Sequence, residues 1–332
     1  MPLKPITPNA STEKKIYLLK PRGFCAGVVR AIDVVKIALN LYGAPVYVRK
    51  EIVHNTHVVQ ELRALGAVFV EELEEVPNGG RAIFSAHGVS PDVRRQGKER
   101  NLEIIDATCP LVTKVHLEAV KFAREGYTII LIGHRNHDEV IGTLGEAPTR
   151  MTLVESVEDV DALEVADPTR MCYLTQTTLS LDETTDIIAR LTERFPAIHG
   201  PKSQDICYAT ENRQMAVKGV ANFCDLLLLV VGSSNSSNSK RLVEVGTDRN
   251  VRSYLVNDWS EVDPAWLEGV TNVGVTAGAS APEHLVEELV AALQTKGFGQ
   301  LEEVEMIEED VRFSLPPELA GAAQQLVTIG SR

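Results

Sequence analysis

Three of the five cysteines in this chain occupy the same kind of local sequence. Cys25, Cys109 and Cys207 each follow a hydrophobic, strand-like run and precede an amphipathic, helix-like run. Each thiol is therefore expected near a helix N-terminus, where free N–H groups and the helix dipole favour the thiolate. Because a thiolate is a nucleophile or a metal ligand, this repeated strand-to-helix turn constrains both the fold and the function.

The spacing of these cysteines does not match a compact metal motif. They are 84 and 98 residues apart (109 − 25 and 207 − 109), unlike the C-x-x-C pairs of zinc fingers and bacterial ferredoxins. A shared site must therefore be assembled by tertiary structure, and ligands bind where parallel strands end. The turns predict three similar α/β lobes around one centre, where three thiolates would leave a four-iron cluster with one iron open to substrate. Cys172 and Cys224 lie within or beside hydrophobic runs and are predicted core residues, the ordinary role of a free cysteine.

Strand-like and helix-like segments alternate along the whole chain, which is the pattern of parallel α/β architecture. The predicted strands are 15–20, 45–50, 81–88, 103–108, 128–134, 152–156, 171–177, 226–233, 252–258 and 272–278. The predicted divisions are a first lobe at 28–109, a second at 110–203, a third at 204–297 joined by the N-terminal strand 15–27, and terminal extensions at 1–14 and 298–332.

Composition excludes several classes of partner. A net charge of −13 gives no general attraction for nucleic acid. No run approaches the roughly 20 apolar residues of a membrane span, and the first residues lack an apolar signal core. Five widely spaced cysteines argue against a disulfide framework and for a reducing compartment. We therefore expect a cytoplasmic protein with no nucleic-acid partner and no membrane contact.

Polar residues follow many of the predicted strands and would converge on one crevice if they lie at the carboxyl edges of parallel strands. They are His54, His87, His137, Glu139, Thr177, Thr178, Ser236, Ser237, Asn238 and Ser280. Thr178 and Ser280 also fit helix caps, and a capped helix N-terminus is itself an anion site. Imidazole donors indicate an anionic ligand held without a Lys/Arg clamp, and Glu139 is the candidate proton donor.

Neither G-x-x-x-x-G-K-[ST] nor G-x-G-x-x-G occurs, which disfavours a Walker-type or standard dinucleotide site. Nine other motifs are distinctive: PRGFCAGV, VHN, FSAHGVS, DATCPLVTKVH, GHRNHDEVIGT, TQTTLS, DICYAT, GSSNSSNS and TAGASAP. In this order, from about Ile16 to Gly297, they resemble the 4-hydroxy-3-methylbut-2-enyl diphosphate reductase family, also called LytB or IspH.

The resemblance implies a trefoil of three α/β lobes with pseudo-threefold symmetry and mostly parallel sheets around a central 4Fe-4S cluster. Cys25, Cys109 and Cys207 would be its ligands, and its fourth iron would bind the substrate hydroxyl. The implied reaction is the two-electron reductive dehydroxylation of an allylic diphosphate to isopentenyl and dimethylallyl diphosphates in the non-mevalonate isoprenoid pathway. The implied electron donor is a ferredoxin or flavodoxin.

Matching of motif positions also implies the role of each polar residue. His54, His87, His137, Ser236, Asn238 and Ser280 would hold the diphosphate, with Ser237 in the same loop, while Glu139 and Thr177 would lie by the hydroxyl with Thr178 adjacent. Position within H-x-E favours His137 over His134, and Asp138 stands where the family commonly has proline.

Three other classes of protein remain open from the residues. An iron–sulfur hydro-lyase would use the open iron as a Lewis acid and need no electron donor. A non-enzymatic iron–sulfur redox sensor would not need the polar residues around one pocket. A zinc hydrolase would use the same Cys, His and Glu ligand types, but no compact ligand spacing supports it.

Overall fold

The computed structural model describes residues 13–225 and 227–319. The predicted extensions therefore fall partly on residues 1–12 and 320–332, which lie outside the described residues. The chain divides into two compact units, one joining the chain up to Gly23 to Asn212–Glu309 and the other joining Phe24–Glu211 to the chain from Asp310 onward. Within the described ranges, no helix is long and apolar enough to cross a membrane.

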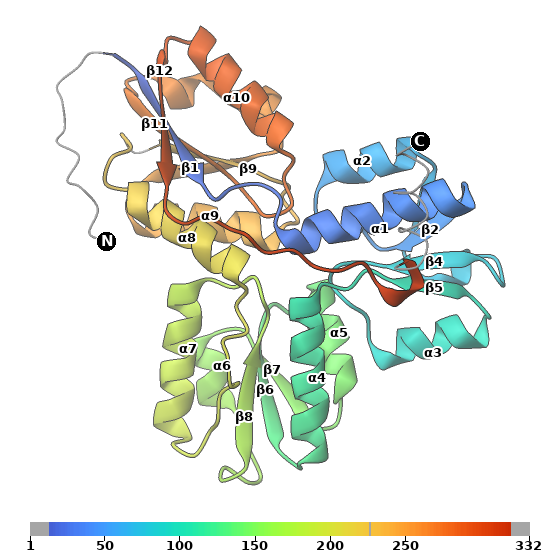
Figure 1. The fold of residues 1–332 in the computed structure, drawn as a ribbon. Coiled ribbons are helices and arrows are strands. Elements are labelled where there is room, and N and C mark those ends of the chain that lie inside the picture. Colours follow the sequence, from blue (N-terminus) through green and yellow to red (C-terminus); the bar gives the residue numbers. More distant parts are fainter. Residues whose placement is uncertain (1–12, 226, 320–332) are drawn as a thin grey trace. The chain divides into compact units, whose positions relative to one another are not determined.

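The unit that contains both Gly23 and Asn212–Glu309 is built on a five-stranded parallel sheet with the order β10-β9-β11-β1-β12 (Figure 1). Its strands are β1 (Lys15–Lys20), β9 (Leu227–Val231), β10 (Arg252–Val256), β11 (Asn272–Ala277) and β12 (Gln300–Glu305). Its helices are most of α8 (Tyr208–Val220), α9 (Ser237–Asp248), α10 (Glu283–Thr295) and the short η2 (Trp259–Glu261) and η3 (Pro264–Leu267).

Strand β1 shows why this sheet is covered on both faces. Ile16 and Leu18 belong to the hydrophobic core that includes α10, whereas Tyr17 and Leu19 belong to the core that includes α8 and α9. Successive side chains of a strand point to opposite faces, so a strand buried on both sides is apolar throughout. The continuous apolar run of β1 is the sequence signal of this arrangement.

Strand β12 differs from the sequence prediction, which placed residues 298–332 outside the lobes. It pairs in parallel with β1 along its whole length, from Gln300 opposite Lys15 to Glu305 opposite Lys20. β12 lies at the edge of the sheet, and charged residues are common on edge strands because they discourage pairing with other chains. Its sequence QLEEVE therefore looks like an acidic tail.

The other unit contains two smaller parallel sheets. The first has the order β3-β2-β4-β5, with β2 (Val46–Arg49), β3 (Ala67–Val70), β4 (Arg81–Phe84) and β5 (Glu103–Asp106), and with α1 (Ala26–Tyr42), α2 (Thr56–Ala64), α3 (Pro91–Glu99) and η1 (Leu73–Glu75). Its core on one side joins β2 and β4 to α1 and α2 and includes Leu319. Part of the predicted C-terminal extension is therefore packed against this lobe.

The second sheet of this unit has the order β7-β6-β8. Its elements are β6 (Thr128–Ile132), β7 (Met151–Val154), β8 (Met171–Thr175), α4 (Pro110–Arg124), α5 (Asp138–Glu146), α6 (Val157–Ala162) and α7 (Leu181–Arg194). Ile130 and Ile132 pack with α6 and α7, while Ile129 and Leu131 pack with α4 and α5. The predicted α/β class with parallel sheets is confirmed; the lobe boundaries stay a prediction.

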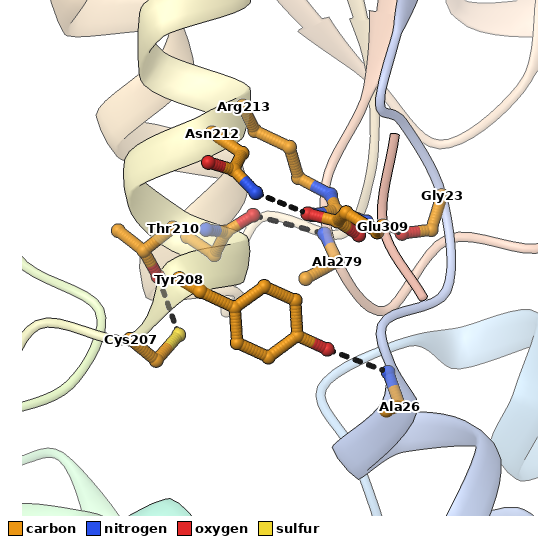
Figure 2. A network of polar contacts seen from close by, with 10 residues as sticks. Gly23, Ala26, Cys207, Tyr208, Thr210, Asn212, Arg213, Ala279 and Glu309 are labelled. Atoms are coloured by element: carbon orange, nitrogen blue, oxygen red, sulfur yellow. Dashed lines mark hydrogen bonds and ion pairs between the residues drawn. The ribbon is translucent and has the colours of Figure 1, made fainter. Parts of the chain in front are cut away.

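Arg213 is the largest fully buried side chain within the described ranges. Its guanidinium lies 3.0 Å from a carboxylate oxygen of Glu309 and donates to the carbonyl oxygen of Gly23 at 2.8 Å (Figure 2). The Asn212 amide also donates to Glu309, at 3.0 Å. These contacts tie the loop after β1 and the segment after β12 to helix α8.

Replacement of Glu309 by alanine should be strongly destabilising, because it removes the carboxylate that faces a buried charge. Truncating one partner of a buried ion pair costs about 3 to 5 kcal/mol, and we expect a loss near the lower limit because 14% of the Glu309 side chain is exposed. Chemical denaturation measures the free energy of unfolding.

The matched control is Glu99→Ala, which removes the carboxylate of an ion pair with Arg95 in which both side chains are more than 60% exposed. Its effect should stay within about 0.5 kcal/mol. Equal small losses in the two variants would contradict a structural role for the buried pair.

Candidate functional site

Each of the three cysteines singled out by the sequence stands at the start of a helix. Cys25 is the N-cap of α1, Cys109 is the N-cap of α4, and Cys207 immediately precedes α8. All three belong to the unit of Phe24–Glu211. The expected position of these thiols at helix N-termini is confirmed.

The three thiols gather in one place. A Cβ atom added at Gly27 would lie 2.8 Å from the sulfur of Cys109, so this close approach requires glycine, and 3.8 Å from the sulfur of Cys25, which is an ordinary contact distance. Burial, and then the Cys25 thiol, raises the pKa of Cys109 to about 12 and the pKa of Cys207 to about 11. Neighbouring thiolates repel one another, so a strongly charged metal group is needed to hold all three deprotonated.

The distances between these sulfurs favour a multinuclear group over a single ion. In the described part of the chain, the three thiols do not form a set whose atoms all lie within 4.8 Å of one another. A tetrahedral zinc ion with bonds of about 2.3 Å would bring its sulfur ligands to within about 3.8 Å. The donor set, three thiols at three helix N-termini, fits a larger iron–sulfur cluster.

The two remaining cysteines serve as an internal comparison. Cys172 is fully buried in the core between β8 and α4, and Cys224 is 8% exposed in the core that includes α8 and α9. Both are surrounded by apolar side chains, as predicted. Their burial shows that a buried thiol alone does not mark a site in this protein.

Glu139 and Thr177 form a buried pair beside the thiols. The backbone N–H of Thr177 donates to one carboxylate oxygen at 2.7 Å, and its hydroxyl donates to the other at 3.0 Å. Burial raises the pKa of Glu139 to about 7, although the two Thr177 hydrogen bonds act in the opposite direction. A carboxyl group that is half protonated near neutral pH is suited to general acid catalysis.

Thr177 also connects this acid to the cysteines. Its carbonyl oxygen accepts a hydrogen bond from the backbone N–H of Cys207 at 3.0 Å. Glu139 is close enough to contribute to the raised pKa of Cys207. The candidate proton donor and one candidate metal ligand are thus held by the same residue.

Three histidine rings lie against one another in the same unit. The rings of His54 and His87 stack with centroids 4.0 Å apart, and His137 meets them edge-on at 5.3 and 5.7 Å. His54 follows β2, His87 follows β4, and His137 is the N-cap of α5 after β6. The predicted convergence of these strand-end histidines is therefore present in the structure, and their role as ligands to a diphosphate stays a prediction.

The hydrogen bonds of these rings indicate which nitrogen atoms can donate. The Nδ1 atom of His137 accepts from the backbone N–H of Glu139 at 3.2 Å, so the proton of the neutral ring is on Nε2. Burial, followed by the neighbouring His54 and His137, holds the pKa of His87 well below its usual range. Neutral imidazoles can donate to an anion without adding charge.

His54, His87 and Asp138 form the one group in the described ranges whose potential metal-binding atoms all lie within 4.8 Å of one another. The two rings are nearly parallel, at 19°, so their in-plane lone pairs do not converge well on one ion. The pKa of Lys50 is raised mainly by its hydrogen bond to Glu71 and to a smaller extent by Asp138. We therefore interpret Asp138 as a partner of this cation.

Most of the remaining predicted site residues lie in the other unit, at the start of α9 and in the loop after β11. Ser236, Ser237, Asn238 and Ser280 are each less than 8% exposed. Ser236 caps α9 by accepting from the N–H of Ser239, and the side-chain oxygen of Asn238 accepts from the N–H of Ala279 at 2.9 Å. The loops after β9 and β11 are thus joined. Thr178 lies in the first unit and accepts from the Gln176 amide at 2.8 Å.

His116 of helix α4 is not among the predicted site residues, but it packs against the turn that carries His87. Its ring is 4% exposed, its Nδ1 lies 2.9 Å from Glu146, and Glu146 also pairs with Arg94 at 2.9 Å. Its Cε1 would be 3.2 Å from a Cβ at Gly88 and 3.4 Å from one at Gly142. The His116 ring therefore packs against Gly88, the residue after His87, and against Gly142 of helix α5. No short-range spacing reveals a contact between residues 30 positions apart.

Two residues of α8 were also missed. The hydroxyl of Thr210 lies 3.2 Å from the sulfur of Cys207, and the Tyr208 hydroxyl accepts from the N–H of Ala26 at 3.3 Å (Figure 2). The i,i+3 spacing of Cys207 and Thr210 at a predicted helix start could have indicated the first contact. The hydrogen bond between Tyr208 and Ala26 joins the turns that carry Cys207 and Cys25, and no local sequence pattern indicates it.

Comparison with known proteins identifies the family of this chain. A family model described as LytB protein matches residues 16–294. The chain is 56% identical over 308 residues to the 4-hydroxy-3-methylbut-2-enyl diphosphate reductase of Acidothermus cellulolyticus, which covers 92% of this chain and 90% of that relative. It is 55% identical over 315 residues to the reductase of the same name from Rhodococcus opacus, covering 95% and 94%.

Solved structures give the same result. The E-1-hydroxy-2-methyl-but-2-enyl-4-diphosphate reductase of Plasmodium falciparum matches with a TM-score of 0.92 and 43% identity, over 95% of this chain and 99% of that chain. A second reductase structure, of the terminal enzyme of the non-mevalonate pathway, matches with a TM-score of 0.60 and 32% identity, over 85% and 99%. Because the family model and the relatives cover most of its length, the chain belongs to the LytB protein family.

Proposed function

We propose that this chain is a 4-hydroxy-3-methylbut-2-enyl diphosphate reductase. It converts the (E)-4-hydroxy-3-methylbut-2-enyl diphosphate to isopentenyl and dimethylallyl diphosphates, the last step of the non-mevalonate pathway. Two electrons and two protons are consumed, and the hydroxyl leaves as water. The observation that carries this function is the buried acid Glu139, linked through Thr177 to Cys207 among three convergent thiols.

LytB proteins are iron–sulfur enzymes, and the thiol set of this chain fits such a group. We assign Cys25, Cys109 and Cys207 as the three ligands of a 4Fe-4S cluster whose fourth iron is open to the substrate. When bound, the cluster supplies the electrons and a Lewis-acidic iron that weakens the C–O bond of the substrate. The close approach of Cys25 and Cys109 at Gly27, and the positions of the cysteines at helix N-termini, support this assignment.

Glu139 supplies the proton that the departing hydroxyl needs, because hydroxide is a poor leaving group. The neutral carboxyl can pass its proton to the Thr177 hydroxyl, which lies 3.0 Å away, while that hydroxyl gives its own proton to the substrate. Burial keeps a large fraction of Glu139 protonated near pH 7. Positioned acid catalysis of this kind contributes typically ~10²- to 10⁴-fold.

The diphosphate is assigned to imidazole, hydroxyl and amide donors. His54, His87 and His137 lie together in one unit, and the proton of His137 is on Nε2. The family resemblance implies the same role for Ser236, Ser237, Asn238 and Ser280, whereas Thr178 would lie next to Thr177, by the substrate hydroxyl. Their low exposure and their position around the N-terminus of α9, a favourable place for anions, support this role.

The electron donor is proposed to be a small ferredoxin or flavodoxin, because the reaction needs external electrons delivered in single steps. The proposed compartment is the cytoplasm. The five cysteines of the described ranges are all free thiols, and free thiols persist in a reducing compartment.

Anaerobic purification followed by a reductant test examines the function directly. We expect a brown protein with four irons per chain that forms both C5 diphosphates from the hydroxylated substrate only when a reductant such as dithionite is present. Turnover without reductant would favour a hydro-lyase, and an iron-loaded protein without turnover would favour a redox sensor. A colourless protein with stoichiometric zinc would overturn the cluster assignment.

Serine substitutions should separate the proposed ligands from the core cysteines. Cys25→Ser, Cys109→Ser and Cys207→Ser should lose most of the iron and the activity, since serine does not replace a thiolate ligand. Cys172→Ser and Cys224→Ser are the controls and should keep their iron. Iron and sulfide analysis of all five folded variants makes the comparison, and equal loss throughout would contradict the ligand set.

Glu139→Gln should lower turnover by about 10²- to 10⁴-fold while leaving the iron content unchanged. In the wild type, the active form of Glu139 is protonated, so turnover should be highest below its pKa of about 7 and fall as pH rises above it. The variant should lose this dependence. A wild-type rate that is constant from pH 6 to 9, or a variant of normal rate, would remove Glu139 from the mechanism.

A further inference from the structure

Thr210 is completely buried and lies in the first turn of α8. Its hydroxyl oxygen is 3.2 Å from the sulfur of Cys207, and its backbone N–H donates to the carbonyl oxygen of Cys207 at 3.0 Å (Figure 2). No step of the proposed mechanism uses this residue. Its side chain is nevertheless directed at the sulfur of a proposed cluster ligand.

The direction of this hydrogen bond follows from the chemistry of the ligand. In a free thiol either atom can donate. A cysteine that binds iron is a thiolate and has no proton to give, so Thr210 has to be the donor. A charge-assisted bond of this type is stronger than a neutral one, and a buried setting strengthens it further.

Cys207 is distinguished from the other two thiols by this contact. Backbone N–H groups of Leu111 and Val112 face the sulfur of Cys109. Across the described ranges, neither Cys25 nor Cys109 has a side-chain hydroxyl within hydrogen-bond distance of its sulfur, whereas Cys207 has that of Thr210. The Thr210 hydroxyl therefore donates to a proposed cluster ligand. A substitution of Thr210 removes this hydrogen bond and leaves the ligand in place.

The surrounding contacts hold Thr210 in this position. The N–H of Cys207 is fixed by the carbonyl oxygen of Thr177 at 3.0 Å, and the hydroxyl of Tyr208 is fixed by the N–H of Ala26 at 3.3 Å. The first two residues of the turn that carries Cys207 and Thr210 are thus anchored. The distance between sulfur and hydroxyl is set by the fold.

We propose that Thr210 is a positioning residue that raises the reduction potential of the cluster through its hydrogen bond to Cys207. This inference rests on the proposed function and specifies how the bound group is tuned. A hydrogen bond withdraws electron density from the thiolate, which favours the more reduced form of the cluster. Thr210 would therefore determine how readily the electron donor reduces the cluster by its first electron.

The test is a dye-mediated redox titration of the holoenzyme, followed by electron paramagnetic resonance in the absence of substrate. In Thr210→Val, which keeps the shape and removes the hydroxyl, the ratio of reduced to oxidised cluster at a fixed potential should fall roughly three- to tenfold. For a one-electron couple this is a shift of about 28 to 59 mV to more negative potential. Thr210→Ser restores a hydroxyl and should return the potential towards the wild-type value.

Thr113→Val is the matched control. Thr113 is four residues after Cys109, but its hydroxyl donates to the carbonyl oxygen of Cys109 at 3.3 Å and is exposed. Its loss should leave the potential unchanged. An unchanged potential in an iron-replete Thr210→Val variant, or an equal shift in Thr113→Val, would overturn the proposal.

A comparison of Thr210→Ala with Thr210→Ser and an assay of turnover distinguish the remaining outcomes. If Thr210→Val does not retain iron, Thr210→Ala removes the same hydroxyl with a smaller side chain and should show the same negative shift relative to Thr210→Ser. Equal potentials in the alanine and serine variants would contradict the proposal. Because the titration needs no substrate, failure of the reductase assignment would appear as absent turnover with the potential shift intact.

Discussion

The gathering of three partly buried thiols in one place is the constraint on which the rest of this site depends. Burial, and to a smaller extent the neighbouring Cys25 thiol, raises the pKa values of Cys109 and Cys207, so each added thiolate is harder to form. The chain lowers this cost by placing each cysteine at a helix N-terminus and by directing N–H groups at the sulfurs. In the proposed cluster, the positive charge of the iron would supply the remaining compensation.

At Glu139 the same low-polarity surroundings are an advantage, because the proposed role of this residue needs its neutral form. Burial favours the neutral acid, whereas the two donors of Thr177 favour the carboxylate, and the opposing effects leave its pKa near neutrality. His87 is held neutral by burial as well. Burial thus accounts both for the raised pKa of Glu139 and for the lowered pKa of His87.

Much of this organisation could be predicted from the sequence, because the cysteine turns and the strand-end histidines repeat one local pattern. The α/β class and the positions of Cys25, Cys109 and Cys207 at helix starts follow from that pattern. Strand β12 could not be recognised, because an edge strand tolerates charges that hide its alternation. The support of His87 by His116 depends on close packing at Gly88 and Gly142, which only the three-dimensional structure provides.

The two hydrogen bonds from Thr177 to Glu139 also bear on what happens after the proton has left. A newly formed carboxylate usually requires surrounding dipoles to turn towards it, and this reorganisation slows a reaction. Here an N–H and a hydroxyl already point at the two oxygens. The acid can therefore pass between its neutral and ionised forms without rearrangement of the backbone. Between the proposed catalytic cycles, Glu139 then needs a new proton but no change in backbone conformation.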